Sequence, residues 1–531
     1  MSFDWLKISL QDAYVFLFHI AFKYCSLLLL LLFAVPGCKL GPNFHSPAAP
    51  QTTRYIQDDI IKKTVNAPEA RASGKAQNFN LGQDISAEWW YVFHSTELNT
   101  LILAGLRNNA SLAAAKAALI NAQENYRAQV GNLFPTVSGH FTAERQRFSL
   151  TQFGGSSTGP VGANTFNLFN AYINAAYTLD VFGGIRRQIE AAGAQADYEQ
   201  FELEAAFLTL SSNIATTAII LASLESQRLA TNKLIRVQEH TLNLVKKQFA
   251  LGGVSKSDVL LQENQLAQTK ATLPPIKQNI AINKHILSTL IGELPTEHAI
   301  PVLNLDKLNL PTDLPLSCPS LLVRQRPDIR AAESLVHSAS ALIGVATANL
   351  FPQVTINGNY GQQSTSLGTL FKPQNNVWNI TGAVAQTIFS GGTLLAQRRA
   401  AIAAYEQAAA QYKQTVLQAF QNVADVLRAL QHDAQLLKAQ KEAEIAALVS
   451  LNMIQKQFRL GGVSYLNLLA AERSYQEAVI SRIQAQSARY TDTVALFQSL
   501  GGGWWNRCLL NCNPLLTSNL QQYRPEVFGR I

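Results

Sequence analysis

The chain repeats itself, and this duplication constrains the possible folds more than any other feature of the sequence. Three pairs of segments align in the same order: Arg107–Ala115 with Arg324–Ala332, Asn132–Pro135 with Asn349–Pro352, and Gln248–Ser255 with Gln457–Ser464. The first two pairs are offset by 217 residues and the third by 209. The copies span roughly residues 88–296 and 305–503, so the fold must be built from two units of one kind.

Within each copy the hydrophobic periodicity changes in the same order. An Ala-rich helix is expected first, at about 98–131 and 318–348, and it gives way to the period-two alternation typical of a strand with one apolar face. Four strands are expected, at about 136–148, 166–180, 353–363 and 377–389. Strands of this length suffice to cross a bilayer when they are tilted.

A very long helix follows the strands in each copy. From Thr393 to Leu460, 68 residues contain neither Gly nor Pro, and from Ile185 to Leu251 only Gly193 interrupts. At 1.5 Å per residue such a helix is about 100 Å long. Apolar residues follow a heptad spacing at Val416, Phe420, Val423, Leu427, Leu430, Ala434 and Leu437. We therefore expect long coiled helices, packed side by side, over about 185–291 and 393–500.

Both long helices end in the same five residues. The two motifs are Leu251-Gly252-Gly253-Val254-Ser255 and Leu460-Gly461-Gly462-Val463-Ser464. Glycine at a helix end and serine as the next N-cap predict that the chain reverses here, with at least one glycine of the second motif at positive φ. Pro274 and Pro275 predict a bend in the first returning helix that the second lacks.

Composition and cysteine usage exclude several classes of protein. Only 15% of the residues are charged, and the 43 Lys and Arg against 35 acids form no basic run, so no nucleic-acid partner is expected. The cysteines at 25, 38, 318, 508 and 512 form no CxxC pair and have no His at zinc spacing, which predicts neither metal nor cofactor. Nucleophile elbows and phosphate loops are absent too, so the chain is not expected to be an enzyme. A disulfide between Cys508 and Cys512 stays open.

The amino terminus has the order of an export signal. Lys23 precedes the apolar run Cys25–Val35, and Gly37 stands before Cys38. The cysteine resembles that of a bacterial lipobox, which implies lipidation of Cys38 after cleavage; an ordinary signal with an incidental cysteine is the alternative. Lys39 follows it, where Asp would retain a lipoprotein at the inner membrane, so sorting to the outer membrane is implied. The long stretch 1–22 leaves the true start codon open.

The predicted strands also set the oligomeric state. Four spanning strands per chain cannot close a barrel, for which about eight is the working minimum, and open sheet edges are not tolerated in lipid. The chain must therefore oligomerise. Two protomers would give a plugged interior and three would give a pore, so a trimer explains a conduit better. The predicted organisation is a signal peptide 1–37, a lipidated amino-terminal segment 38–87, the two repeats 88–296 and 305–503, and a carboxy-terminal tail 504–531.

Several motifs together resemble one family. The segment Gly37–Phe44 with Pro47, the run Trp89–Phe93, the paired Phe-Pro elements and the paired Leu-Gly-Gly-Val-Ser motifs resemble the outer-membrane efflux lipoproteins, the NodT-like branch of the TolC outer-membrane factor family. The resemblance covers essentially everything after residue 37. It implies an α+β membrane protein, a homotrimeric channel-tunnel with a shared 12-stranded outer-membrane β-barrel and a periplasmic α-barrel of long helices.

The same resemblance implies function and partners. Drugs or other small molecules would leave through the tube, surrounded by outer-membrane lipid, with a periplasmic adaptor (membrane fusion) protein and an inner-membrane RND or other pump as partners. The tips would dock the adaptor and constrict the tunnel, although the glycines can also be read as turn formers alone. Family members often carry acidic residues just after the second tip. Here Asn467 and Ala470 stand in those places with Glu472 nearby, so Asn467 and Glu472 are the constriction candidates and a cation-selective ring is not expected.

Other residues and functions remain to be weighed. Arg186, Arg187, Arg398 and Arg399 follow the Gly-Gly pairs and would either meet lipid phosphates or, as we favour, hydrogen-bond between neighbouring helices. Trp89 and Trp90 are interpreted as packing residues rather than a binding platform. The alternative functions are the outer-membrane channel of type I protein secretion and, with less support, a trimeric adhesin. The lipobox and the amino-terminal motif favour efflux.

Overall fold

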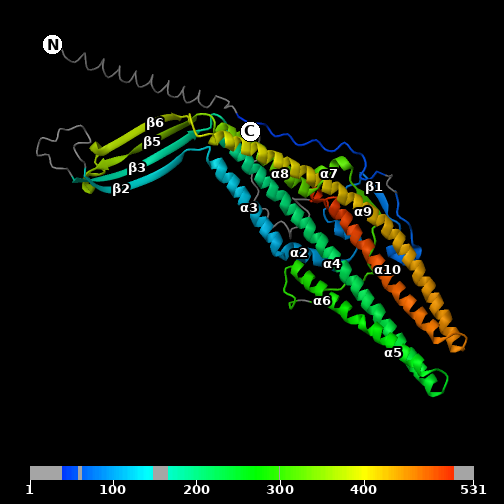
Figure 1. Cartoon of the computed structure of the whole chain (residues 1–531). Helices are drawn as coiled ribbons and strands as arrows, with labels where there is room; N and C mark the ends of the chain where they lie inside the picture. The colour runs from blue at the N-terminus through cyan, green and yellow to red at the C-terminus, as the bar shows by residue number, and fades with distance from the viewer. Residues whose placement is uncertain (1–38, 58–61, 148–164, 298, 508–531) are drawn as a thin grey trace, which may run out of the picture. The chain divides into compact units, whose positions relative to one another are not determined.

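The computed structural model describes residues 39–57, 62–147, 165–297 and 299–507 (Figure 1). Four cysteines of the sequence analysis, Cys25, Cys38, Cys508 and Cys512, lie outside these ranges. The chain divides into two compact units. The first comprises Met1–His45, Gln123–Ala194 and Val336–Gln407, and the second comprises Ser46–Ala122, Gln195–Leu335 and Ala408–Ile531.

The two halves of the chain contain corresponding elements. Those of the first half are η1 (Pro68–Gly74), β1 (Asn78–Leu81), η2 (Trp89–Phe93), α2 (Thr96–Asn108), α3 (Ala110–Gly131), β2 (Thr136–Arg147), β3 (Thr165–Leu179), α4 (Gly184–Ala250), α5 (Lys256–Ala271) and α6 (Leu273–Leu290). Those of the second half are β4 (Asp313–Leu316), α7 (Pro319–Gln325), α8 (Pro327–Ala348), β5 (Gln353–Ser364), η4 (Leu367–Thr369), η5 (Pro373–Asn375), β6 (Asn376–Ala385), α9 (Thr393–Arg459), α10 (Tyr465–Ser499) and η6 (Trp504–Asn506). Helix pair, strand pair, long helix and returning helix therefore occur twice in the same order.

Local chemistry explains where the helices differ from the expected ranges. The first returning helix breaks between α5 and α6 at Thr272, just before Pro274 and Pro275, whereas α10 continues for 35 residues without a break. Both Ala-rich helices are divided, which the periodicity did not predict. The first division is at Asn109, whose side chain caps α3 by accepting from the Leu112 amide at 3.1 Å. The second is at Arg326, the residue before a proline.

The first unit contains an antiparallel sheet in the order β2-β3-β5-β6 (Figure 1). Each repeat contributes two strands, and the central pair β3-β5 joins the repeats, with Ile173 opposite Tyr360. Strand β6 ends at Ala385, four residues before the expected end, and all of its residues are exposed. The outer edges of β2 and β6 have no strand partner among the described residues. Such edges require pairing with another chain or protection from it.

The second unit is held together by a helical core. The long helices α4 and α9 each have 67 residues. Six of the seven predicted heptad positions of α9 are buried, and Phe420 packs partly buried against the same cluster. One window of α4 is apolar enough to cross a membrane, but half of it is buried inside the protein. Because Ile214, Ala218 and Leu221 are fully buried on α4, this apolarity belongs to the core.

The segment that precedes the first repeat lies in the same core of the second unit. Strand β1 pairs in parallel with β4, with Asn78 opposite Asp313. The buried Arg489 of α10 donates to the carbonyl oxygens of Ser73 at 2.8 Å and Lys75 at 2.7 Å. The Gln77 side-chain amide donates to the Thr493 hydroxyl at 3.2 Å. These hydrogen bonds fix the segment to α10. They also allow the charged Arg489 side chain to be buried, because a buried charge needs hydrogen-bond partners.

Candidate functional site

The two tips predicted from the repeated motif have the same backbone geometry. At the first tip, Gly253 N donates to Gln248 O at 2.8 Å and Gly252 N donates to Phe249 O at 2.9 Å. At the second, the matching amides of Gly462 and Gly461 donate to Gln457 O at 2.8 Å and Phe458 O at 3.0 Å. Both are Schellman caps, in which the first glycine has φ of +76°. Each tip therefore needs glycine at its first position, Gly252 or Gly461, and not at the second.

The helices that leave the tips start differently. Ser255 accepts from the Asp258 amide at 3.2 Å, and the Asp258 carboxylate accepts from the Ser255 amide at 2.9 Å, which completes a capping box. In the second tip Asn467 replaces this acid, and the Ser464 side chain makes no capping bond. The chain reversal at the first tip is therefore stabilised more than that at the second, because its capping box satisfies one more pair of backbone amides at the helix start.

The apex of each tip presents an apolar side chain to solvent. Leu251 and Leu460 are each 87% exposed. Beneath them a small core joins the two tips within the second unit, formed by Val245, Val259, Leu451, Tyr465, Leu468 and Ala471. Each tip therefore places one exposed apolar side chain above a packed core.

The two constriction candidates lie in opposite environments. Asn467 is exposed, whereas Glu472 is 3% exposed and packs beside the small core. Neither Glu472 oxygen has a hydrogen-bond partner of normal geometry in the described parts of the chain. The Thr241 hydroxyl, which donates to Val237 O at 3.1 Å, lowers the pKa of Glu472 by less than burial raises it. Burial raises the pKa of Glu472 to about 7.

A groove of about 690 Å³ lies behind the tips, on α4, α9 and α10. Its basic lining residues are Lys233, Arg236, His240 and Arg459, and no carboxylate lines it. Within the described chain none of the three strong cations among them has an ion-pair partner. The groove therefore favours a negatively charged group.

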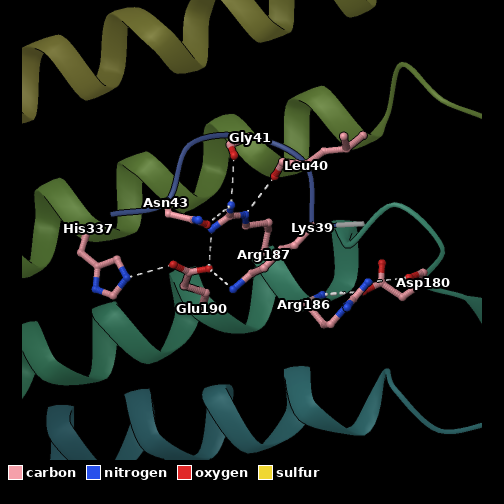
Figure 2. Close-up of polar contacts among 9 residues, drawn as sticks. All are labelled: Lys39, Leu40, Gly41, Asn43, Asp180, Arg186, Arg187, Glu190 and His337. Atoms are coloured by element: carbon pink, nitrogen blue, oxygen red, sulfur yellow. Dashed lines mark hydrogen bonds and ion pairs between the residues drawn. The ribbon is translucent and has the colours of Figure 1, made fainter. Parts of the chain in front are cut away.

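Of the four arginines after the Gly-Gly pairs, Arg187 alone is buried, whereas Arg398 and Arg399 are exposed. Arg187 is 1% exposed and donates from Nε to Leu40 O at 2.9 Å and from Nη2 to Gly41 O at 3.1 Å (Figure 2). Arg186 binds the Asp180 carboxylate, 2.9 Å away, in its own turn. Arg398 donates to Thr347 of α8 at 3.3 Å, as expected for a contact between helices. Because Arg187 is buried, it cannot contact a lipid phosphate. It binds the amino-terminal segment instead of a neighbouring helix, and no local sequence pattern indicated this contact.

The remaining candidates are structural within the described residues. Trp89 and Trp90 are buried, and Trp89 stacks on Phe497 with ring centres 5.4 Å apart. The described residues contain no group of three or more His, Cys, Asp and Glu that could hold a metal ion. His140 stacks on Tyr172 with ring centres 5.1 Å apart. Packing accounts for these side chains.

Comparison with known proteins gives concordant matches. The family model described as outer membrane efflux protein matches residues 101–293 and 318–502, once in each repeat and over more than half of the chain. A probable efflux pump outer membrane protein of Pseudomonas putida, TtgC, is 27% identical over 478 residues, which cover 90% of this chain and 94% of the relative. The pyoverdine export outer membrane protein OpmQ of Pseudomonas aeruginosa is 28% identical over 477 residues, or 89% and 95% of the two chains. The solved outer-membrane channel OprN matches with a TM-score of 0.78 and 26% identity, over 88% of this chain and 100% of that chain.

Proposed function

The chain belongs to the outer membrane efflux protein family, and we propose that it forms the duct through which a tripartite efflux system exports drugs or other small molecules. It is an outer-membrane channel that extends into the periplasm, and it is not an enzyme. Its partners are two further copies of itself, a periplasmic adaptor and an inner-membrane pump of the RND or another class.

The sheet of the first unit is the observation that carries this proposal. Its four strands leave β2 and β6 with open edges, which lipid does not tolerate. Three copies close a 12-stranded barrel, and a barrel of that size leaves an aqueous interior. The exposed side chains of β2 and β6 become lipid-facing or lumen-facing in that assembly.

The tips supply the docking surface of this duct. We assign adaptor contact to the two motifs Leu251–Ser255 and Leu460–Ser464, whose matched caps present two exposed leucines. Asn467, which is exposed next to the second motif, is assigned to the constriction. Glu472 is not assigned to the constriction, because its carboxyl is buried and cannot line an open channel in this conformation. Lipidation of Cys38 stays a proposal, since that residue lies outside the described ranges.

Deletion of the gene tests the function. Efflux predicts that the deletion strain becomes several-fold more susceptible to a set of toxic small molecules and that the wild-type gene restores resistance. Type I secretion predicts instead that one polypeptide disappears from the culture medium with no change in susceptibility. The second result would refute export of small molecules while leaving the channel fold intact. One relative from Pseudomonas putida is named for toluene efflux and one from Pseudomonas aeruginosa for pyoverdine export, so the identity of the exported molecules must come from the susceptibility profile.

A further inference from the structure

The first unit contains a buried arginine whose hydrogen-bond acceptors come mainly from the start of the mature chain. We propose that Arg187 and Glu190 of α4 form a docking site for the processed amino terminus, which holds Lys39–Asn43 against the junction of β3 and α4 (Figure 2). Docking places the residue after Cys38 at this junction, so that the lipid would leave the chain beside the barrel. That last consequence rests on the proposed lipidation; docking of the segment does not.

The site recognises the segment largely through its main chain. Besides the two bonds to Leu40 O and Gly41 O, Arg187 Nη2 donates to Asn43 Oδ1 at 2.8 Å. The Leu40 amide donates to Phe182 O at 3.2 Å, at the end of the β3 turn. Both peptide groups of Leu40 are therefore used, and the rigid fork of the guanidinium suits adjacent carbonyl oxygens.

Hydrogen-bond satisfaction of Arg187 also requires the segment, although its charge is paired with Glu190 on the same helix. Glu190 accepts from Arg187 Nη1 at 2.9 Å, from Lys39 Nζ at 2.6 Å and from His337 Nε2 at 3.1 Å. If the segment left, Arg187 Nε and Nη2 would lose every acceptor that they have among the described residues. Buried donors left without acceptors are unfavourable. The site is thus built to be occupied.

Two glycines let the segment approach the helices. A Cβ added to Gly344 of α8 would lie 2.8 Å from Leu40 O and 2.7 Å from Arg187 Cγ. A Cβ on Gly41, which has φ of +89°, would lie 2.4 Å from Gly344 Cα. The floor of the site therefore excludes any side chain, and Phe44 then stacks on His337 with ring centres 4.4 Å apart.

The duplication shows that this site is not a general feature of the repeat. Counted from the second glycine of each pair, Arg187 and Glu190 correspond to Leu395 and Arg398. Leu395 is 57% exposed. The second copy thus has the same fold without the site, which fits a chain that has two repeats and one amino terminus.

Hydrogen exchange on the purified full-length protein tests docking directly. The Leu40 amide should exchange slowly in the wild type. Arg187→Lys keeps the positive charge but loses the forked guanidinium, and Gly344→Ala places a methyl group where the segment packs against α8. Each variant should speed amide exchange over residues 40–44 at least tenfold. Gly193→Ala is the matched control, because its Cβ would meet only the Tyr126 ring, at 3.4 Å.

The outcomes separate docking from helix packing. Docking requires that amides of β3 and α4 keep wild-type protection in both variants. If these amides lose protection together with the segment, Arg187 acts in helix packing and the proposal is wrong. It is also wrong if residues 40–44 exchange freely in the wild type.

Limited trypsin digestion of the folded protein gives a second measurement. The Lys39 ammonium is held by Glu190, so cleavage after Lys39 should be slow in the wild type and faster in both variants. The exposed Arg54 serves as the internal control site. Equal cleavage after Lys39 in all proteins overturns docking. Failure of palmitate to label Cys38 would remove the lipid from the proposal but would not change either result, and neither result bears on efflux.

Discussion

Replacement of Glu472 by glutamine should stabilise the tips at neutral and alkaline pH. The carboxyl is buried beside the small core of the tips, and neither of its oxygens has a hydrogen-bond partner of normal geometry among the described residues. When it is protonated, its own hydroxyl can donate to an oxygen such as that of Thr241. Burial therefore favours the neutral form and raises the pKa from 4.5 to about 7.

The sign and size of the effect follow from this shift. Between pH 4.5 and 7 the native tip keeps a proton that the unfolded chain has lost, so tip stability is highest below pH 4.5 and falls as pH rises to about 7. The loss is about 3 kcal/mol, at about 1.4 kcal/mol for each pKa unit. Glu472→Gln has no charge to bury, so at pH 8 it should recover most of that loss and change little at pH 4.

Hydrogen exchange of the tip helices measures the prediction. The opening free energy of residues 242–261 and 451–471 is followed from pH 5 to 8, after correction for the intrinsic pH dependence of exchange. Glu477→Gln is the control, because this acid lies on the same helix with its side chain 65% exposed and paired with Arg473. If the wild-type tips show no pH slope, or if Glu472→Gln keeps the slope, the carboxyl is not a buried neutral acid and the reasoning fails.

Four further predictions concern assembly and docking. Gly461→Val forces a branched residue to positive φ at a local cost of about 1–3 kcal/mol; trimer yield should hold while adaptor cross-linking at Val463 falls, whereas Gly462→Ala, at negative φ, should behave as wild type. Arg236→Glu, in the basic groove behind the tips, should weaken adaptor cross-linking, and high salt should weaken it in the wild type. An unchanged cross-linking yield would exclude the groove as a contact for the adaptor. Palmitate should label the wild type and not Cys38→Ser, and persistent label would refute lipidation there. Cross-linked complexes should reach about three times the mature mass, and a ladder that stops at dimers would contradict the barrel.

The sequence predicted the elements whose signal is periodic or repeated. The α9 seam was found because a heptad is a local pattern, and Val423, Leu430 and Leu437 are fully buried as it requires. The tips were found because one motif occurs twice. Which glycine takes positive φ was not predicted, since both positions carry glycine and only the cap hydrogen bonds distinguish them.

Burial of Glu472 was missed although a signal existed. Tyr465, Leu468 and Glu472 are spaced by three and four, so Glu472 falls on the buried stripe of α10. Because it is acidic and lies near the second tip, it was interpreted as a candidate for the channel constriction. Heptad counting outward from Tyr465 would have placed it in the core.

The arginine site could not have been predicted in the same way. Arg187 and Leu40 are 147 residues apart, and two of the acceptors are main-chain oxygens that any sequence provides. The two glycines carry sequence information, but a single glycine in a helix or loop has many explanations. Contacts of this kind become visible only when the fold brings the segments together.

The attachment of the early segment to α10 has a consequence for how the chain folds. Gln77 bonds Thr493 and Arg489 bonds Ser73, each across 416 residues of sequence. In a nascent chain the bonds of Gln77 and Ser73 to α10 therefore cannot form until almost the last helix has been made, and closure of such long loops is slow. We expect the second unit to fold after export of the whole chain and to depend on periplasmic chaperones during that delay. A chain that stops before α10 should be cleared by proteases rather than accumulate as a half-assembled duct.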